Sequence, residues 1–293
     1  MKILICSDGM PAADNATRVG GLIARACGAD TTLLGIAERP ADEQPLRQAL
    51  EAQSELLRAD GVTPSILVGA GEPISEMVEQ TSANIYDLVV IGSRTTSRSG
   101  LHWRTAKTYE VIKVIPAPVL VAIGDCTQLK RFLVCTGGKA FIDAAVQLTG
   151  KVAAAIGATV TLLHVMAEPP AIYADLVQLE EDLDRLLESG SELGQNLVRQ
   201  QKQLEAMGVT AEVRVRHGMV VDQVFAEARE GNHDLIVTGS SQARGTLRHY
   251  IMGDLTRTVL NRSECPVLVA RSGLLPAGNF WTRLKNIFQT GQI

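Results

Sequence analysis

Short runs of apolar residues alternate along the chain with longer stretches in which apolar residues recur at helical spacing. The runs are continuous and rich in β-branched residues, which is typical of strands in a parallel sheet that helices cover on both faces. In the first 125 residues the predicted strands are 2–7, 31–37, 63–68, 87–92 and 118–123, and the predicted helices are 12–27, 41–59, 73–83 and 103–114. This alternation predicts a doubly wound α/β fold with right-handed crossovers. Ligands of such folds bind beyond the carboxyl ends of the strands.

The chain contains two copies of one unit. KILICSDG at 2–9 aligns with RFLVCTGG at 131–138, and DLVVIGS at 87–93 aligns with DLIVTGS at 234–240. Shorter matches in the same order are GA at 28–29 and 157–158, TLL at 32–34 and 161–163, and PVLVA at 118–122 and 266–270. Five blocks in one order indicate an internal repeat. We therefore predict two α/β domains, at 1–125 and 130–271.

The second copy is the longer one. About 18 residues enter it after its second predicted strand, and the region from about 171 to 207 is rich in Leu, Glu, Gln and Arg. These residues are mostly good helix formers, so the insertion is predicted to be one long helix or a helix pair. HW at 102–103 and HY at 249–250 occupy equivalent positions in the two copies, each at the predicted start of the fourth helix of its unit.

Residues 272–293 extend beyond the second domain. Five apolar residues of this extension fall on one helical stripe, namely Phe280, Trp281, Leu284, Ile287 and Phe288. Such a stripe either docks back onto the protein or contacts a partner or a membrane. Because few basic residues accompany it, we do not expect the tail alone to attach the protein to lipid.

Composition narrows the class of protein. The 293 residues carry a net charge of −4, which argues against a nucleic-acid binder. No apolar run reaches the roughly 18–20 residues that cross a bilayer, and the N-terminus enters a strand pattern without a signal-peptide layout. The five cysteines form no Cys-x-x-Cys pair and the five histidines show no ligand spacing, so neither a disulfide framework nor a metal site is indicated. A cytoplasmic protein is expected.

The residues that carry the repeat resemble the universal stress protein family. KILICSDG at the N-terminus, the later DLVVIGS and the closing PVLV carry the likeness, and two such units resemble the tandem members of that family. The resemblance implies a five-stranded parallel sheet of order 3-2-1-4-5 in each half, with the halves related as a pseudo-dimer. The last strands, at about 118–123 and 266–271, are expected to pair either within the chain or between chains, which leaves a homodimer through them open.

The resemblance also implies where a nucleotide would bind. Nucleotide-binding members of the family hold the ribose with an Asp at the end of the first strand. They hold the phosphates with a loop of the form Gly-x2-Gly-x9-Gly-Ser/Thr after the fourth strand. Such a loop suits phosphates because glycines let backbone N–H groups approach them, and a helix N-terminus adds a favourable dipole.

The first copy retains the beginning of this site. Its candidate nucleotide-binding residues are Asp8, at the ribose position, and Gly92, Ser93 and Arg94, which open the loop. The second glycine of the loop is replaced by Thr95, and the closing Gly-Ser pair by Thr105 and Ala106. Basic side chains in this region offer another way to hold an anion.

The second copy retains a different part. Its candidate residues are Gly239, Ser240 and Gly253, all in or near the loop. Gly137 stands at the ribose position, so a charged hydrogen-bond acceptor worth roughly 1.5–3 kcal/mol is missing. Gln242 replaces the second glycine, and Asp254 falls where a hydroxyl would meet a phosphate. A carboxylate about 4 Å from a phosphate charge costs about 4 kcal/mol at an effective dielectric constant near 20.

Neither copy therefore has both parts of a nucleotide site. A complete fold pattern with incomplete sites predicts a non-catalytic stress-response protein that acts through contacts with an unidentified protein partner. The alternative is a regulatory protein that binds ATP or AMP through the site of the first copy. No other cofactor is indicated.

Overall fold

The structure is a computed structural model. It describes residues 1–10, 14–92, 101–137, 143–166, 183–242, 250–251 and 253–271, so the extension at 272–293 lies outside the described residues. Within the described part, no helix is long and apolar enough to span a membrane.

Every strand and helix predicted for the first half is present. The half consists of β1 (Lys2–Cys6), α1 (Asp14–Cys27), β2 (Asp30–Ala37), a short 3₁₀ helix η2 (Pro40–Asp42), α2 (Glu43–Ala59), β3 (Ser65–Ala70), α3 (Pro73–Ala83), β4 (Leu88–Gly92), α4 (Leu101–Val114) and β5 (Val119–Ala122). Sequence signals at the ends of the elements have their expected effect. Pro73 occupies the first turn of α3, and the Glu72 carboxylate caps that helix by accepting from the Ser75 backbone N at 2.8 Å.

The second half repeats this order with additions. Its elements are β6 (Arg131–Cys135), α5 (Asp143–Ile156), β7 (Thr159–Met166), α7 (Leu183–Glu188), α8 (Glu192–Ala206), β8 (Ala211–His217), α9 (Val220–Glu230), β9 (Leu235–Gln242), β10 (Tyr250–Ile251), α10 (Asp254–Arg262) and β11 (Val267–Arg271). The described part of the insertion is the helix pair α7 and α8. The prediction that Tyr250 begins the fourth helix of this unit is wrong: Tyr250 lies in β10, antiparallel to the end of β9, and α10 begins at Asp254.

The two halves form a single mixed sheet. Its strands follow the order β3-β2-β1-β4-β5-β11-β9-β6-β7-β8, and β10 pairs with β9 off this path. Each half has the predicted order 3-2-1-4-5 with parallel strands, counted as β1 to β5 and as β6, β7, β8, β9 and β11. The halves meet where β5 and β11 pair antiparallel within the chain, with Leu120 opposite Leu268. The edges that a homodimer through the last strands would use are therefore occupied within this chain.

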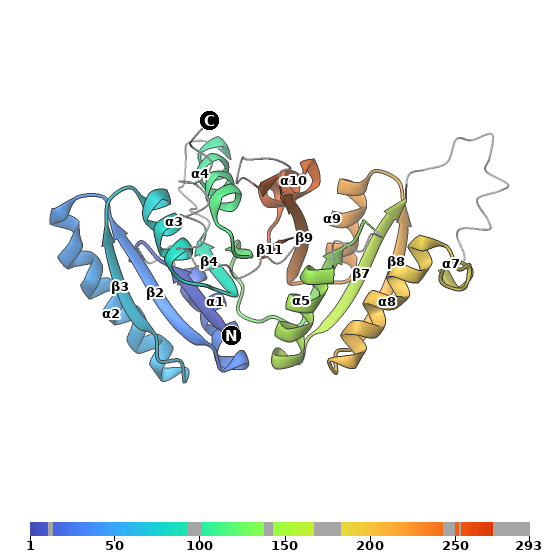
Figure 1. Ribbon diagram of the computed structural model, residues 1–293, viewed down its shortest axis with the longest axis horizontal. Helices are drawn as coiled ribbons and strands as arrows, with labels where there is room; N and C mark the ends of the chain where they lie inside the picture. The colour runs from blue at the N-terminus through green and yellow to red at the C-terminus, as the bar shows by residue number, and fades with distance from the viewer. Residues whose placement is uncertain are drawn as a thin grey trace, which may run out of the picture.

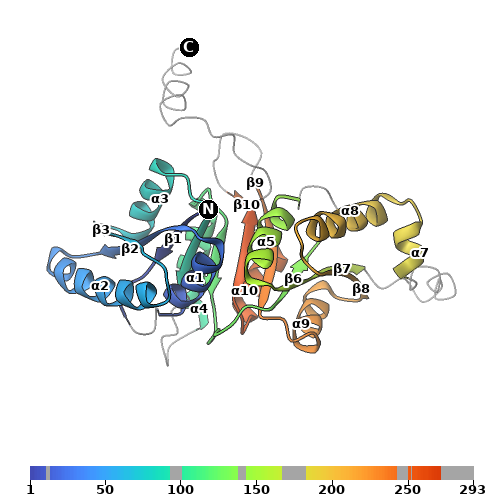
Figure 2. The same ribbon diagram turned by 90° about the horizontal axis from the view of Figure 1, so that it is seen from below.

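Helices cover both faces of the sheet, as Figures 1 and 2 show. The apolar core on one face lies beneath α1, α2, α5 and α8, and it contains Ile5, Leu50, Val146 and Leu197. The core on the other face lies beneath α3, α4, α9 and α10. Both cores run through the two halves without a break, so the chain forms one three-layer α/β/α body.

Direct contacts fasten the halves together at this seam. The Tyr109 hydroxyl of α4 donates to the Arg257 carbonyl of α10 at 2.8 Å. Gly124, two residues after the end of β5, has a φ of +71°, and a β-carbon added there would lie 2.0 Å from the Glu264 carbonyl oxygen. The backbones of the two halves thus approach each other more closely at Gly124 than any other residue type allows.

Candidate functional site

The candidate site of the first half lies at the carboxyl ends of β1 and β4, which are neighbours in the sheet. Asp8 follows β1, and its Oδ1 accepts a hydrogen bond from the Met10 backbone N at 3.0 Å. Gly9 has a φ of +73° and packs against α2, where an added β-carbon would lie 2.9 Å from Ala49 Cβ. Asp8 therefore sits in a tight turn that its own carboxylate helps to close.

Gly92 is the last residue of β4 and reaches the same edge of the sheet as Asp8. The structure thus brings together the two first-half candidates that it describes. Ser93 and Arg94 lie outside the described residues. Their place in the site stays a prediction.

The corresponding strand end in the second half contacts α8, the helix that precedes β8 as α2 precedes β3. The buried Thr136 hydroxyl, at the end of β6, donates to Gln200 Oε1 of α8 at 3.1 Å. His164 Nδ1 of β7 donates to the Thr136 carbonyl at 2.9 Å. Gly137 is exposed, and a β-carbon added there would have nothing within 4 Å. The position equivalent to Asp8 in this half is therefore exposed and lacks a carboxylate.

Ser240 of the second half is engaged inside the protein. It is 3% exposed, and its hydroxyl donates to the Ala270 carbonyl at 3.1 Å while accepting from Arg271 Nη1 at 3.0 Å. Arg271, itself 5% exposed, also donates to the carbonyls of Ala117 at 3.0 Å and Ile115 at 2.7 Å, beyond the last turn of α4. The arginine at the end of β11 therefore ties Ser240 to the first half.

The remaining second-half candidates flank helix α10. Gly239 lies next to Ser240 in β9, and its carbonyl accepts from the Thr256 hydroxyl at 3.1 Å. Gly253 is the N-cap of α10, and exposed Asp254 begins the helix. A carboxylate in the first turn stabilises a helix through its dipole, and it repels an anion that would bind at the same end.

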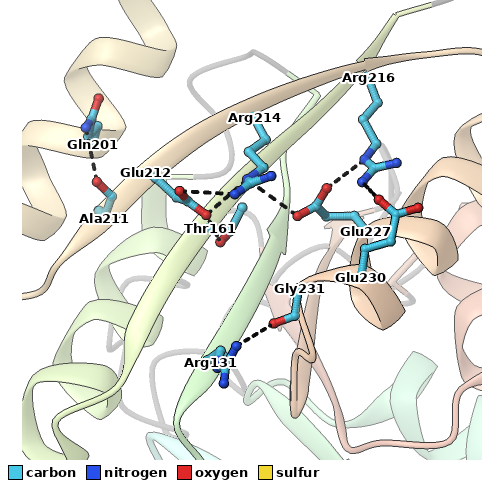
Figure 3. A network of polar contacts seen from close by, with 10 residues as sticks. All are labelled: Arg131, Thr161, Gln201, Ala211, Glu212, Arg214, Arg216, Glu227, Glu230 and Gly231. Carbon is cyan, nitrogen blue, oxygen red and sulfur yellow. Dashed lines mark hydrogen bonds and ion pairs between the residues drawn. The ribbon is translucent and has the colours of Figure 1, made fainter.

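A charged network that the sequence did not reveal lies at the outer edge of the second half (Figure 3). Glu227 of α9, with its side chain 1% exposed, contacts Arg216 at 2.6 Å and Arg214 at 3.6 Å. Arg214 also pairs with Glu212 at 3.1 Å, and Arg216 with Glu230. A glutamate on an amphipathic helix ordinarily faces solvent, so helical spacing alone gave no signal that this one is buried.

The pKa of Glu212 reflects its place in this network. Partial burial raises it, but hydrogen bonds from Arg214 and Thr161 outweigh that effect and lower the pKa below its usual range. The carboxylate therefore remains charged at neutral pH.

Two cysteines in strands of the described part are poor candidates for a reactive thiol. Cys6 and Cys135 occupy equivalent strand positions, and burial raises the pKa of each thiol to about 12. A thiol that stays protonated at neutral pH is a poor nucleophile. No group of three metal-ligating side chains comes together among the described residues.

The buried imidazole of His233, near this charged edge, predicts that the stability of the protein depends on pH. Burial lowers the pKa of its imidazole, and no hydrogen-bond partner of its Nδ1 is found among the described residues. Because the His233 imidazole then binds a proton more readily in the unfolded chain than in the folded one, its contribution to the free energy of unfolding is fully present above about pH 6.5. That contribution falls as the pH drops below this value. We expect His233→Asn to reduce this loss between pH 7 and 5, measured by urea unfolding at each pH. If the pH dependence were the same in the variant, the loss of stability at low pH could not be assigned to His233.

Comparison with known proteins places this arrangement in a family. A model described as "Universal stress protein family" matches residues 1–122 and 128–271. A comparison of the sequence with curated proteins found no match.

Two solved structures share the fold over more than nine-tenths of the chain. A universal stress protein from Archaeoglobus fulgidus DSM 4304 is 20% identical, with 93% of this chain and 98% of that chain covered and a TM-score of 0.65. A putative universal stress protein from Pseudomonas aeruginosa UCBPP-PA14 is 16% identical, with 92% of each chain covered and a TM-score of 0.67. A universal stress protein from Archaeoglobus fulgidus in complex with dAMP is 17% identical and covers 48% of this chain, with 97% of its own length matched and a TM-score of 0.35.

Proposed function

The chain belongs to the universal stress protein family, and from this premise we propose that it is a non-catalytic stress-response protein that acts through protein contacts. The proposal combines a complete fold with two strand-end sites that differ from each other. A protein that turns over a nucleotide needs the groups that hold the phosphates and the groups that hold the rest of the molecule in one place. We infer from the sequence that in this chain they are divided between the halves.

The observation that carries the proposal is the state of Ser240. Ser240 directly follows Gly239, the first glycine of the motif, and its hydroxyl could meet a ligand only if it were free to turn toward it, whereas this hydroxyl is buried and bonded to Ala270 and Arg271. Releasing it would leave buried polar groups unsatisfied, at a cost of about 1–3 kcal/mol. The missing carboxylate at Gly137 and the acidic Asp254 weaken nucleotide binding at this half further.

The alternative function, binding of ATP or AMP for regulation, has support in the first half. Asp8 and Gly92 end adjacent parallel strands, which is where doubly wound sheets bind their ligands. This placement requires the Asp8 carboxylate to serve both its own turn and a ligand. A carboxylate accepts several hydrogen bonds, so the two roles are compatible.

Isothermal titration calorimetry separates the two functions. We expect full-length protein titrated with ATP and Mg²⁺ to give no binding heat up to millimolar nucleotide. Asp8→Ala tests the first-half site, and Asp60→Ala, which removes an exposed carboxylate at the end of α2, is its matched control. Micromolar binding that Asp8→Ala abolishes and Asp60→Ala preserves would replace the proposed function by the alternative.

A further inference from the structure

The sheet has two outer edges, and the chain treats them differently. β3 ends the sheet on the side of the first half, and β8 ends it on the side of the second. No strand of the described part pairs with the outer side of either one. An edge strand presents unpaired backbone N–H and C=O groups, and proteins usually protect such edges with charges.

The β8 edge is protected in this way. Glu212, Arg214 and Arg216 occupy alternate positions of the strand and therefore lie on one face of it, where the buried Glu227 of α9 contacts both arginines (Figure 3). An added strand would place its own side chains on that face directly beside this charged row. The outer edge of the second half is therefore unsuited to pairing.

The β3 edge carries no such protection. Its sequence, SILVGA, contains no charged residue, and Leu67 is 38% exposed. Ile66 and Val68 point to the other face and are only partly buried against the core beneath α1 and α2. The nearest acid, Glu76 of α3, lies over the sheet face, where an added β-carbon on Gly69 would be 3.1 Å from its Oε2.

We propose that β3 pairs antiparallel with β3 of a second copy of this chain, so that the sheet continues across a two-fold axis at Leu67. Side chains on directly opposed residues of an antiparallel pair point to the same face. With Leu67 opposite its equivalent, Ile66 faces Val68 of the other copy on the opposite face, and this contact occurs twice. Ser65 faces Gly69, so this register sets no two charged residues opposite each other.

The seam inside the chain already uses this arrangement. There Leu120 lies opposite Leu268, and valines flank the pair on both strands, as Val119 opposite Val269 and Val121 opposite Val267. β3 offers Ile-Leu-Val where the seam strands offer Val-Leu-Val. At the β5–β11 seam and at the proposed β3–β3 contact alike, an antiparallel junction without charged residues is stabilised by apolar cross-strand pairs on both faces of the sheet.

A second copy fits this edge better than a head-to-tail neighbour. Pairing of β3 with β8 of another molecule would bring apolar side chains against Arg214 and Arg216, and it would build an open filament. Pairing of β3 with itself closes after two copies. The inference does not depend on the proposed function, since the edge is separate from both strand-end sites.

The mass of the protein in solution is the first test. We expect light scattering on full-length protein to give twice the chain mass of 31.4 kDa. Leu67→Lys, which sets two lysines opposite each other, should weaken dimerisation by roughly tenfold or more. Ile85→Lys is the control, because it sets a lysine at an exposed apolar residue that precedes β4, an inner strand of the sheet, and it should leave the dimer intact.

Cross-linking tests the register. Opposed Cα atoms of an antiparallel pair lie about 4.5–5.5 Å apart, which a disulfide bridges. Leu67→Cys should therefore form an oxidised dimer rapidly. Ser65→Cys should not, because its two copies would be roughly 13 Å apart. Wild-type protein that is monomeric throughout, or a dimer that Leu67→Lys leaves unchanged, would overturn the proposal.

Discussion

Replacing Arg271 by alanine is expected to lower the free energy of unfolding by about 3 kcal/mol. The guanidinium is buried and donates to the Ser240 hydroxyl and to carbonyls that follow helix α4, including those of Ala117 and Ile115. Its removal leaves several buried acceptors without a donor in the interior, where water does not replace it. Chemical denaturation followed by circular dichroism measures the loss.

Two further variants distinguish the geometry from the charge. Arg271→Lys retains the positive charge but cannot reproduce the planar fork of donors, so it should recover only part of the lost stability. Arg47→Ala, at a half-exposed pair with Glu43, should change stability by no more than about 0.5 kcal/mol. If Arg271→Ala were as mild as Arg47→Ala, Arg271 would not be a structural link between the halves.

Replacing Gly124 by alanine is expected to destabilise the protein by about 3 kcal/mol or more. Two costs add at this position. The φ of +71° disfavours any side chain, and the new β-carbon would lie 2.0 Å from the Glu264 carbonyl oxygen. Because the contact is to backbone, relief requires the seam between β5 and β11 to shift. Thermal and urea unfolding report the effect.

Gly28→Ala is the matched control for this prediction. Gly28 also has a positive φ, of +55°, but an added β-carbon there would meet nothing within 4 Å. It should cost only the conformational part, about 1 kcal/mol. Equal losses in the two variants would mean that the close approach at the seam is not limiting.

The sequence predicted the fold well because the fold depends on local patterns. The continuous apolar run before Gly92 gave β4, and the repeat extended the same reading to β9 in the second half. What the pattern could not decide was how β5 and β11 pair, because an apolar run such as PVLVA fits a partner in the same chain or in another. Tyr250 was misplaced because equivalence to a helical position in the first half did not allow for the two-residue strand β10.

The candidate sites were less predictable than the fold, because the burial of a side chain in the folded protein determines which groups it contacts. Ser240 directly follows the first glycine of the motif, at a position that the motif leaves open, and nothing in the motif indicates that Arg271, some thirty residues later, occupies its hydroxyl. The equivalent of Arg271 in the first half is Ile123, so comparison of the two copies could not predict the contact between Arg271 and Ser240 either. Glu227 was hidden in the same way, since its two arginine partners lie on a strand from which it is separated in sequence.

These residues have in common that each has a chemically different counterpart in the other half. Arg271 has an apolar counterpart in the first half, and the arginine-rich β8 has the uncharged β3 as its counterpart. The first half has Asp8 and an uncharged sheet edge, whereas in the second half the Ser240 hydroxyl is bonded to Arg271 and the sheet edge is charged.

Native mass spectrometry of gently purified full-length protein tests the central claim, that neither half assembles a working nucleotide site. The account predicts only masses that are multiples of the bare chain, in the wild type and in Asp8→Ala alike. A wild-type species heavier by one adenine nucleotide, absent from Asp8→Ala, would contradict it.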